Sequence, residues 1–329
     1  MRRIWVEFLP PEELRRPSTL ELLATYQLQP LVAVTPERST DALGSALASL
    51  SKRGLTFGLW PLFSDAEGYW LNEANAARFT ERVEGALAVA REAKATPTTV
   101  AFDLEPPLEV TRQLLEGPSV SLVRRRAAQV RLPSHREARA RAETSLDRVR
   151  ADLRGRFECL AAVPPPIALE LGTKSHLIQR MLGTETERFD FDRVSAMAYT
   201  SLIAQALPVG GKAGPRWLLH ETARALVAWR PNAASLSLGL VGTGKLGTEP
   251  TLDSPDELRA DVAAALAAGV YDLALFSLEG VLGSANPEAW LDAFTSTVAR
   301  APRPSESVRW TIRGLRWGLR ASATVKGTR

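Results

Sequence analysis

The regular alternation of two kinds of segment constrains the fold of this chain more than any other feature. Short β-rich runs alternate with Ala-, Leu- and Arg-rich runs that are typical of helices, which predicts an α/β fold with a parallel sheet. Eight strand candidates in 329 residues predict a single (β/α)8 TIM barrel. The predicted strands span residues 4–9, 31–35, 54–60, 98–104, 166–171, 194–199, 235–241 and 272–278.

A doubly wound open sheet is the alternative architecture. Such sheets usually carry a glycine-rich turn after their first strand, but Pro10 and Pro11 follow the first predicted strand here. Residues 109–157 lack a strand signal, and their Arg-, Ala- and Glu-rich composition predicts a long helical insertion after the fourth strand, broken near Pro133. We expect the barrel domain to span residues 1–302.

Residues 303–329 form a basic C-terminal tail. Within 308–320, arginine recurs at helical spacing and Trp, Ile and Leu occupy the remaining positions, which predicts an amphipathic helix. The arginines are Arg309, Arg313, Arg316 and Arg320. Three alternatives are open for this segment: it makes weak contact with an anionic membrane surface or polymer, it packs against the barrel, or it is disordered.

Composition narrows the classes of function. The formal charge is +4, and residues 305–329 carry six Lys or Arg against one Glu, so the remainder is nearly neutral and a nucleic-acid partner is disfavoured. The single cysteine, Cys159, rules out an internal disulfide and a Cys-rich zinc site. The amino terminus lacks an apolar signal region and no run approaches about 18 apolar residues, which predicts a soluble, cytoplasmic protein.

Two acids at the end of the fourth predicted strand mark the candidate site. Asp103 and Glu105 lie two residues apart, so their side chains point to the same side of the strand. Pro106 and Pro107 end the strand and place Glu105 at its carboxyl end. Buried acids are costly unless they are paired or used, and the third and fifth predicted strands contain no basic residue. We therefore predict a functional role for both.

Other acids and aromatic residues belong to the predicted carboxyl ends of the strands, where the active sites of such barrels lie. Carboxylates perform acid–base chemistry on glycosidic bonds and aromatic faces stack on sugar rings, so a carbohydrate substrate or ligand is predicted. The candidate substrate-binding residues are Trp5, Glu7, Trp60, Glu170, Phe276 and Glu279. The three histidines fall in predicted helices or loops, so neither a metal nor another cofactor is expected.

The run Asp103-Leu104-Glu105 resembles the end of the D-x-x-D-x-D-x-E motif of the family 18 glycoside hydrolases, the chitinase-like enzymes. The segment Met197-Ala198-Tyr199 resembles the family's M-x-Y-D, and 236–240 and 275–280 resemble its last two strands, so the resemblance covers about residues 97–285. It implies that Glu105 is the general acid, that Asp103 orients the substrate's N-acetyl group, that Tyr199 helps to hold this group, and that Met197 lines the site. In that mechanism the N-acetyl oxygen is the nucleophile.

Three positions depart from the family pattern. Thr98 and Ala101 stand where the family has two earlier aspartates, and Thr200 replaces the aspartate after the tyrosine. A non-catalytic carbohydrate-binding relative is therefore a second hypothesis. A phosphosugar lyase or isomerase is a third, because the glycine-rich segment 242–247 follows the seventh strand, where many barrels bind phosphate.

Overall fold

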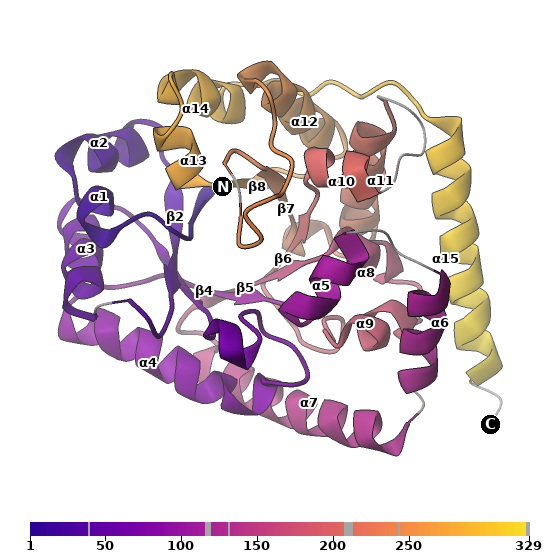
Figure 1. Cartoon of the computed structure of the whole chain (residues 1–329). Helices are drawn as coiled ribbons and strands as arrows, with labels where there is room; N and C mark the ends of the chain where they lie inside the picture. Colours follow the sequence, from indigo (N-terminus) through magenta and orange to yellow (C-terminus); the bar gives the residue numbers. More distant parts are fainter. Residues whose placement is uncertain (39, 116–119, 131, 207–212, 243, 327–329) are drawn as a thin grey trace.

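The computed structural model describes residues 1–38, 40–115, 120–130, 132–206, 213–242 and 244–326 (Figure 1). Eight parallel strands close into a barrel in sequence order, which confirms the predicted (β/α)8 fold. The strands are β1 Arg2–Val6, β2 Gln29–Val34, β3 Gly58–Pro61, β4 Thr99–Asp103, β5 Glu158–Val163, β6 Arg193–Met197, β7 Ala234–Gly239 and β8 Asp272–Phe276. They are buried almost throughout, because helices cover the barrel and side chains fill it.

Helices and short 3-10 turns connect the strands and surround the barrel (Figure 1). Before β4 these are α1 Pro11–Leu14, α2 Pro17–Thr25, α3 Thr40–Lys52, η1 Asp65–Glu67, η2 Ala76–Arg78 and α4 Phe79–Glu92. After β5 they are α8 Pro165–Glu170, α9 Leu177–Leu182, α10 Thr200–Ala206, α11 Gly214–Trp229, η4 Pro231–Ala233, α12 Pro255–Ala267, α13 Leu278–Leu282 and α14 Pro287–Thr295.

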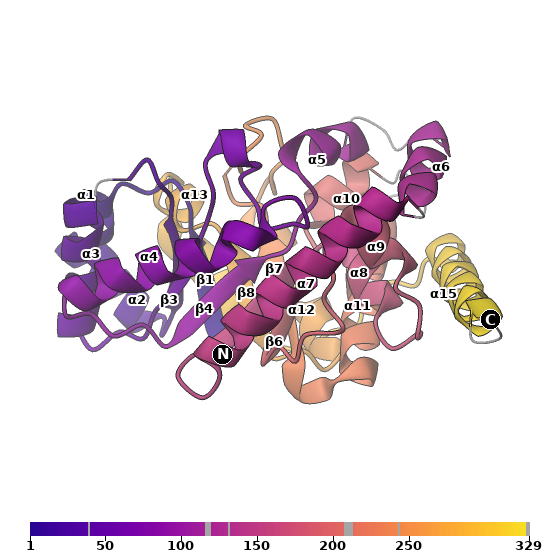
Figure 2. The ribbon, with the colours of Figure 1, turned by 90° about the horizontal axis from the view of Figure 1, so that it is seen from below.

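The helical insertion between β4 and β5 is present as predicted. It comprises α5 Leu108–Leu115, α6 Val120–Gln129 and α7 Pro133–Leu153. Its last helix begins at Pro133, where the break was expected, because proline suits the first turn of a helix. Figure 2 shows α7 running along the barrel beside α4, against which it packs.

The fifth strand differs from its predicted position, and the prediction of a strand at 166–171 is wrong. The strand is β5, and the proline run 164–166 ends it and opens α8, whose first residue is Pro165. The apolar residues that follow look like a strand because α8 is itself a short buried helix. Glu170 therefore ends a helix and does not lie at the carboxyl end of a strand.

A buried ionic cluster fills the amino-terminal end of the barrel. The fully buried Arg3 guanidinium donates to both carboxylate oxygens of Asp272, at 3.0 and 2.9 Å, and lies 2.7 Å from Glu158. Its Nη1 donates to Gln29 Oε1 at 2.6 Å. These partners compensate for the burial of the Arg3 charge, so the cluster has a structural role. Active sites of such barrels lie at the opposite, carboxyl-terminal end.

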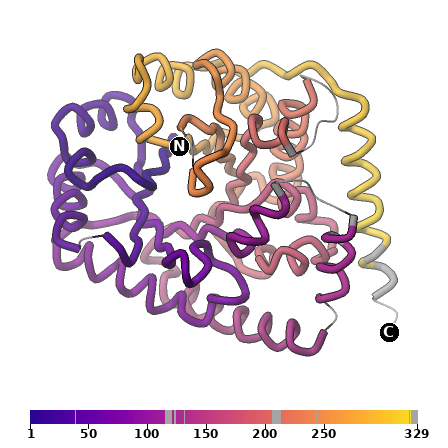
Figure 3. The backbone as a smooth tube through the Cα atoms, in the orientation of Figure 1, coloured from indigo at the N-terminus to yellow at the C-terminus, as the bar shows by residue number. Residues whose placement is uncertain are grey.

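The C-terminal helix α15 (Glu306–Lys326) lies on the outside of the helical layer, as the tube representation shows (Figure 3). It packs against α8 and α11 through the buried side chains of Val308 and Ile312, and Arg316 donates to the carbonyl of Leu169 at 2.6 Å. The tail is thus helical over residues 306–326, as its arginine spacing predicts, and this helix lies on the barrel. Among the described residues, no helix is long and apolar enough to span a bilayer.

Candidate active site

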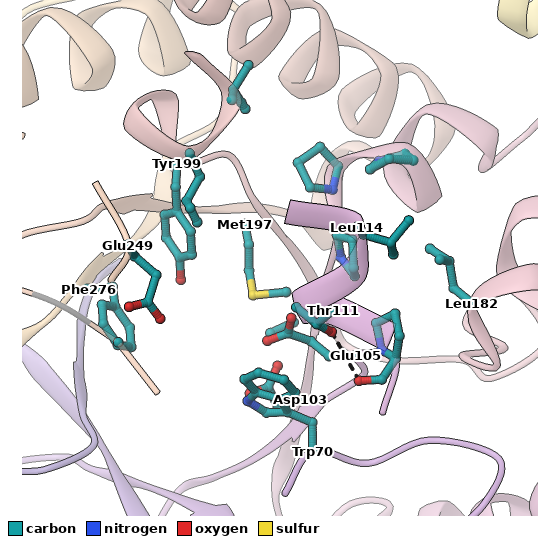
Figure 4. Close-up of a pocket in the computed structure, with 18 of the residues that line it drawn as sticks. Trp70, Asp103, Glu105, Thr111, Leu114, Leu182, Met197, Tyr199, Glu249 and Phe276 are labelled. Atoms are coloured by element: carbon teal, nitrogen blue, oxygen red, sulfur yellow. Dashed lines mark hydrogen bonds between the residues drawn. The ribbon is translucent and has the colours of Figure 1, made fainter. Parts of the chain in front are cut away.

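A cavity of about 550 Å³ opens at the carboxyl-terminal end of the barrel (Figure 4). This volume is in the range of small-molecule sites, roughly 300–1,000 Å³. The cavity brings together most of the residues that the sequence suggested, from strands that are far apart in the chain. Those that line it are Trp5, Glu7, Trp60, Asp103, Glu105, Met197, Tyr199 and Phe276.

Asp103 and Glu105 leave the end of β4 on the same side. The hydrogen-bonded ladder continues one residue past β4, because the Leu104 amide donates to the carbonyl of Ala162 and the Leu71 amide donates to that of Asp103. This extension preserves the alternation of side chains through Glu105. Asp103 is only 4% exposed, whereas Glu105 is half-buried and points into the cavity (Figure 4). Asp103 Oδ1 is buried and makes no hydrogen bond within the described part of the chain.

Burial makes these two carboxyls weak acids. Burial, together with the charge of nearby Glu7, raises the pKa of Glu105 to about 8. The pKa of Asp103 is also well above its ordinary value, because of burial and then the charge of Glu105. Two carboxylates in one desolvated site cannot both ionise cheaply, so the pair retains a proton at neutral pH. A carboxyl that is protonated at neutral pH can act as a general acid.

Glu7 is a third buried acid at the same mouth. It follows β1 and accepts a hydrogen bond from the Tyr69 hydroxyl at 2.6 Å. Burial raises its pKa to about 8, although the Tyr69 hydrogen bond opposes the shift. Lys245 lies over the Tyr69 ring, 4.2 Å from its centre, and pairs with Asp65 at 2.5 Å. Because Asp65 already pairs with this lysine, the cluster of acids is only partly neutralised.

Aromatic side chains form the floor of the cavity. Trp5 and Trp60 meet edge to face with ring centres 4.7 Å apart, and the Trp5 indole donates to Ser237 Oγ at 3.1 Å. Tyr199 and Phe276 lie 5.9 Å apart between their ring centres. Burial and then the charges of the neighbouring acids raise the pKa of Tyr199, so its hydroxyl keeps its proton and can donate to a ligand.

Two predicted substrate-binding acids lie outside the cavity lining. Fully buried Glu170 accepts hydrogen bonds from the amides of Ile178 and Gln179, at 2.9 and 3.0 Å, and thereby fixes the start of α9. Glu279 accepts from the amides of Glu7 and Phe8, at 3.1 and 3.0 Å. Both side chains are thus engaged by the fold, and Glu279 positions the segment that carries Glu7.

Glu249 lines the cavity and was missed by sequence reasoning. Its Oε1 accepts from the Leu246 amide at 2.8 Å, and its Oε2 is buried without a hydrogen-bond partner in the described structure. It lies in the long connection between β7 and α12, several residues past the strand end, where sequence periodicity gives no signal. Figure 4 shows its carboxylate between Tyr199 and Phe276.

The positions that depart from the family 18 pattern leave Asp103 without a second aspartate beside it. Ala101 is fully buried in the barrel and brings no carboxylate. Thr200 begins α10 and donates to Asp261 Oδ2, an acid that also pairs with Arg216 at 2.7 Å. Thr98 accepts from Gln29 Nε2 at 2.9 Å, at the opposite end of the barrel.

The glycine-rich segment 242–247 is poorly suited to phosphate in its described residues, which exclude Thr243. The Leu246 amide is already bound by Glu249, and Lys245 is paired with Asp65. A carboxylate at this loop repels an anion. Among the residues that the structure describes, no group of three or more His, Cys, Asp or Glu side chains is placed to hold a metal ion.

The chain thus has the architecture of a (β/α)8 barrel with acids and aromatic rings at its carboxyl-terminal mouth. No protein-family model and no curated protein sequence matches it. Solved structures that resemble it include the GH5_18 protein from Bifidobacterium longum subsp. longum, with 11% identity, 97% of this chain and 91% of that chain covered, and a TM-score of 0.55. The glycoside hydrolase domain of PgaB (BpsB) from Bordetella bronchiseptica matches with 12% identity, 89% and 98% coverage, and a TM-score of 0.52. These likenesses show a shared (β/α)8 barrel fold.

Proposed function

We propose that this protein is a glycosidase that cleaves a glycan bearing N-acetyl groups, with Glu105 as the general acid. The observation that carries the proposal is the placement of Glu105. Its carboxyl faces the cavity, and its pKa of about 8 keeps it protonated at neutral pH. The similar Bordetella bronchiseptica structure is a glycoside hydrolase domain, and the likeness supports the fold on which this chemistry would take place.

The geometry suggests a role for each group. Glu105 protonates the leaving glycosidic oxygen, and the carbonyl oxygen of the substrate's N-acetyl group attacks the anomeric carbon as that bond breaks. Asp103 Oδ1, which has no hydrogen-bond partner among the described residues, accepts the N–H of this acetamido group and holds it in line. Glu105, now ionised, takes a proton from the water that opens the cyclic intermediate, which restores the N-acetyl sugar. Tyr199 donates to the acetamido group, and the Trp5–Trp60 floor supports the ring.

The test is hydrolysis of chromogenic N-acetylhexosamine oligosaccharides by the native protein and by Glu105→Gln. We expect the variant to lose about 10²–10⁴ in rate, as removal of a general acid does, while it still binds the substrate. Glu109→Gln is the matched control, because this exposed acid in α5 does not line the cavity. Equal rates for native protein and Glu105→Gln would rule out the assigned role.

A non-catalytic carbohydrate-binding protein is the second candidate, and one observation favours it. Ala101 and Thr200 leave Asp103 without the aspartate neighbours of the family 18 pattern. Native protein that binds N-acetylated oligosaccharides, but cleaves none of them, would support this candidate over the enzyme. The phosphosugar hypothesis would require phosphate affinity at 242–247, which Glu249 opposes.

A further inference from the structure

The cavity extends well beyond the acids, into a part that we call the apolar limb. The acids occupy one end, and the other end runs between the insertion, α9, α11 and α15. Figure 4 shows Glu105 where the acid end meets the apolar limb, with Tyr199 and Phe276 on the side of the acid end and Leu114 and Leu182 on the side of the limb. The apolar limb is lined by Leu114, Ile178, Leu182, Leu218, Ile312 and Leu315.

Among its described residues, the apolar limb offers almost no group that a sugar could bind. The hydroxyl-bearing side chains on its wall are Thr111 and Thr311, and both hydroxyls already donate to backbone carbonyls, of Pro106 and Ser307. A saccharide placed there would lose hydrogen bonds to water without replacement. A hydrocarbon chain would lose nothing and would gain from leaving water. The two ends of the cavity therefore suit the two ends of an amphiphile.

The helix that closes the apolar limb is also suited to a lipid surface. Buried Ile312 and partly exposed Leu315 (38%) line the limb from α15, whereas Trp310 and Trp317 are 65% and 74% exposed and do not line it. Arg313 lies over the Trp310 ring, 5.5 Å from its centre. Exposed tryptophan beside arginine on an amphipathic helix is typical of segments that lie at a membrane interface.

We propose that the apolar limb binds the hydrocarbon chain of a lipid-linked saccharide whose sugar lies over Asp103 and Glu105. This inference deepens the proposed function and rests on it for the identity of the sugar. The hydrocarbon chain would leave the cavity along α15, so the exposed Trp310 and Trp317 would face the membrane from which the lipid enters. The limb thereby selects the substrate by its aglycone, and the acid end selects it by its sugar.

The test is a series of N-acetylglucosaminides with methyl, butyl, hexyl and octyl aglycones, measured by calorimetry below their micelle concentrations. Each methylene buried in the limb should tighten binding by about fourfold until the chain outgrows it. Equal affinity across the series would overturn the inference. The measurement is repeated with Glu105→Gln. Chain-length dependence without any hydrolysis by native protein would refute the enzyme proposal and leave the limb proposal standing.

Leu315→Asp places a charge on the wall of the limb and should weaken binding of the octyl glycoside by at least about tenfold, with little effect on the methyl glycoside. Val298→Asp is the matched control, because it introduces the same charge at an apolar side chain that is 80% exposed, lies outside α15 and does not line the cavity, so both affinities should stay unchanged. Thr311→Trp narrows the limb without adding charge and serves if Leu315→Asp fails to fold. Unchanged octyl affinity in a folded limb variant would overturn the proposal.

Discussion

Replacing Glu7 with glutamine should stabilise the protein, and the gain should grow with pH. Glu7 is 3% exposed, and burial raises its pKa from 4.5 to about 8. A carboxyl with a raised folded-state pKa contributes its full stability below the unfolded pKa, and this contribution is lost as pH rises toward the folded pKa. The relevant window is therefore pH 4.5 to about 8. In this window the unfolded chain has released the proton that the folded protein still holds.

The magnitude follows from the width of that window. One pH unit corresponds to about 1.4 kcal/mol of stability for one proton, so the native protein should lose about 3 kcal/mol between pH 4.5 and pH 7 through this group alone. Glutamine has nearly the same shape, does not titrate, and can still accept the Tyr69 hydrogen bond. Glu7→Gln should therefore be more stable than the native protein by about 3 kcal/mol at pH 7, and equally stable near pH 4.5.

Urea denaturation of native protein and Glu7→Gln at pH 5, 6, 7 and 8 measures this difference. Glu37→Gln is the control, since it removes an exposed carboxylate after β2 and should change stability little at any of these pH values. A stability difference that does not vary with pH would refute the reasoning. A Glu7→Gln variant that is less stable than native protein at pH 8 would also refute it, because the fold would then tolerate the buried carboxyl better than glutamine.

Two further predictions concern catalysis and the tail. The rate of hydrolysis should fall as pH rises through about 8, because Glu105 must keep its proton. In Glu7→Gln the pH at which the rate falls should be lower, because the charge of Glu7 helps to raise the pKa of Glu105. Initial rates across a pH series check this, and an identical limit in both proteins would contradict the coupling. Arg313→Gln should weaken sedimentation with anionic vesicles by about fivefold. Arg300→Gln is the control, because Arg300 lies outside α15 and its replacement should leave vesicle binding unchanged. Native protein that binds neutral and anionic vesicles equally would refute an electrostatic contact.

The barrel could be predicted because its signal is repeated. Each apolar run is short and is ended by proline, glycine or a polar residue, and the order of runs and helices leaves few topologies. The one misplaced strand shows the limit of this reasoning. The run 166–171 is apolar for the same physical reason as a strand, namely burial, and only the proline at the start of α8 distinguishes the two. Composition reports burial more directly than it reports backbone conformation.

The acid end of the site could be predicted in part for a similar reason. Acids next to strand ends, such as Asp103 and Glu105, are found by the rule that barrel sites lie there. Glu249 could not be found in this way, because a long loop returns it to the mouth and no local pattern encodes that path. The apolar limb could not be predicted either, since its walls come from helices separated by up to two hundred residues, and each wall residue looks like ordinary core on its own.

The buried acids at the two ends of the barrel differ in whether a cation neutralises them. At the amino-terminal end, Asp272 has Arg3 as a bidentate partner, which holds the pKa of Asp272 below its ordinary value despite burial. At the other end, Glu7 and Glu105 have pKa values near 8, and no comparable arginine lies among the described residues of the lining. The same fold can therefore neutralise buried acids and does so where they serve structure. Acids left protonated beside an open cavity cost stability, and the role in binding or catalysis that we propose would account for this cost.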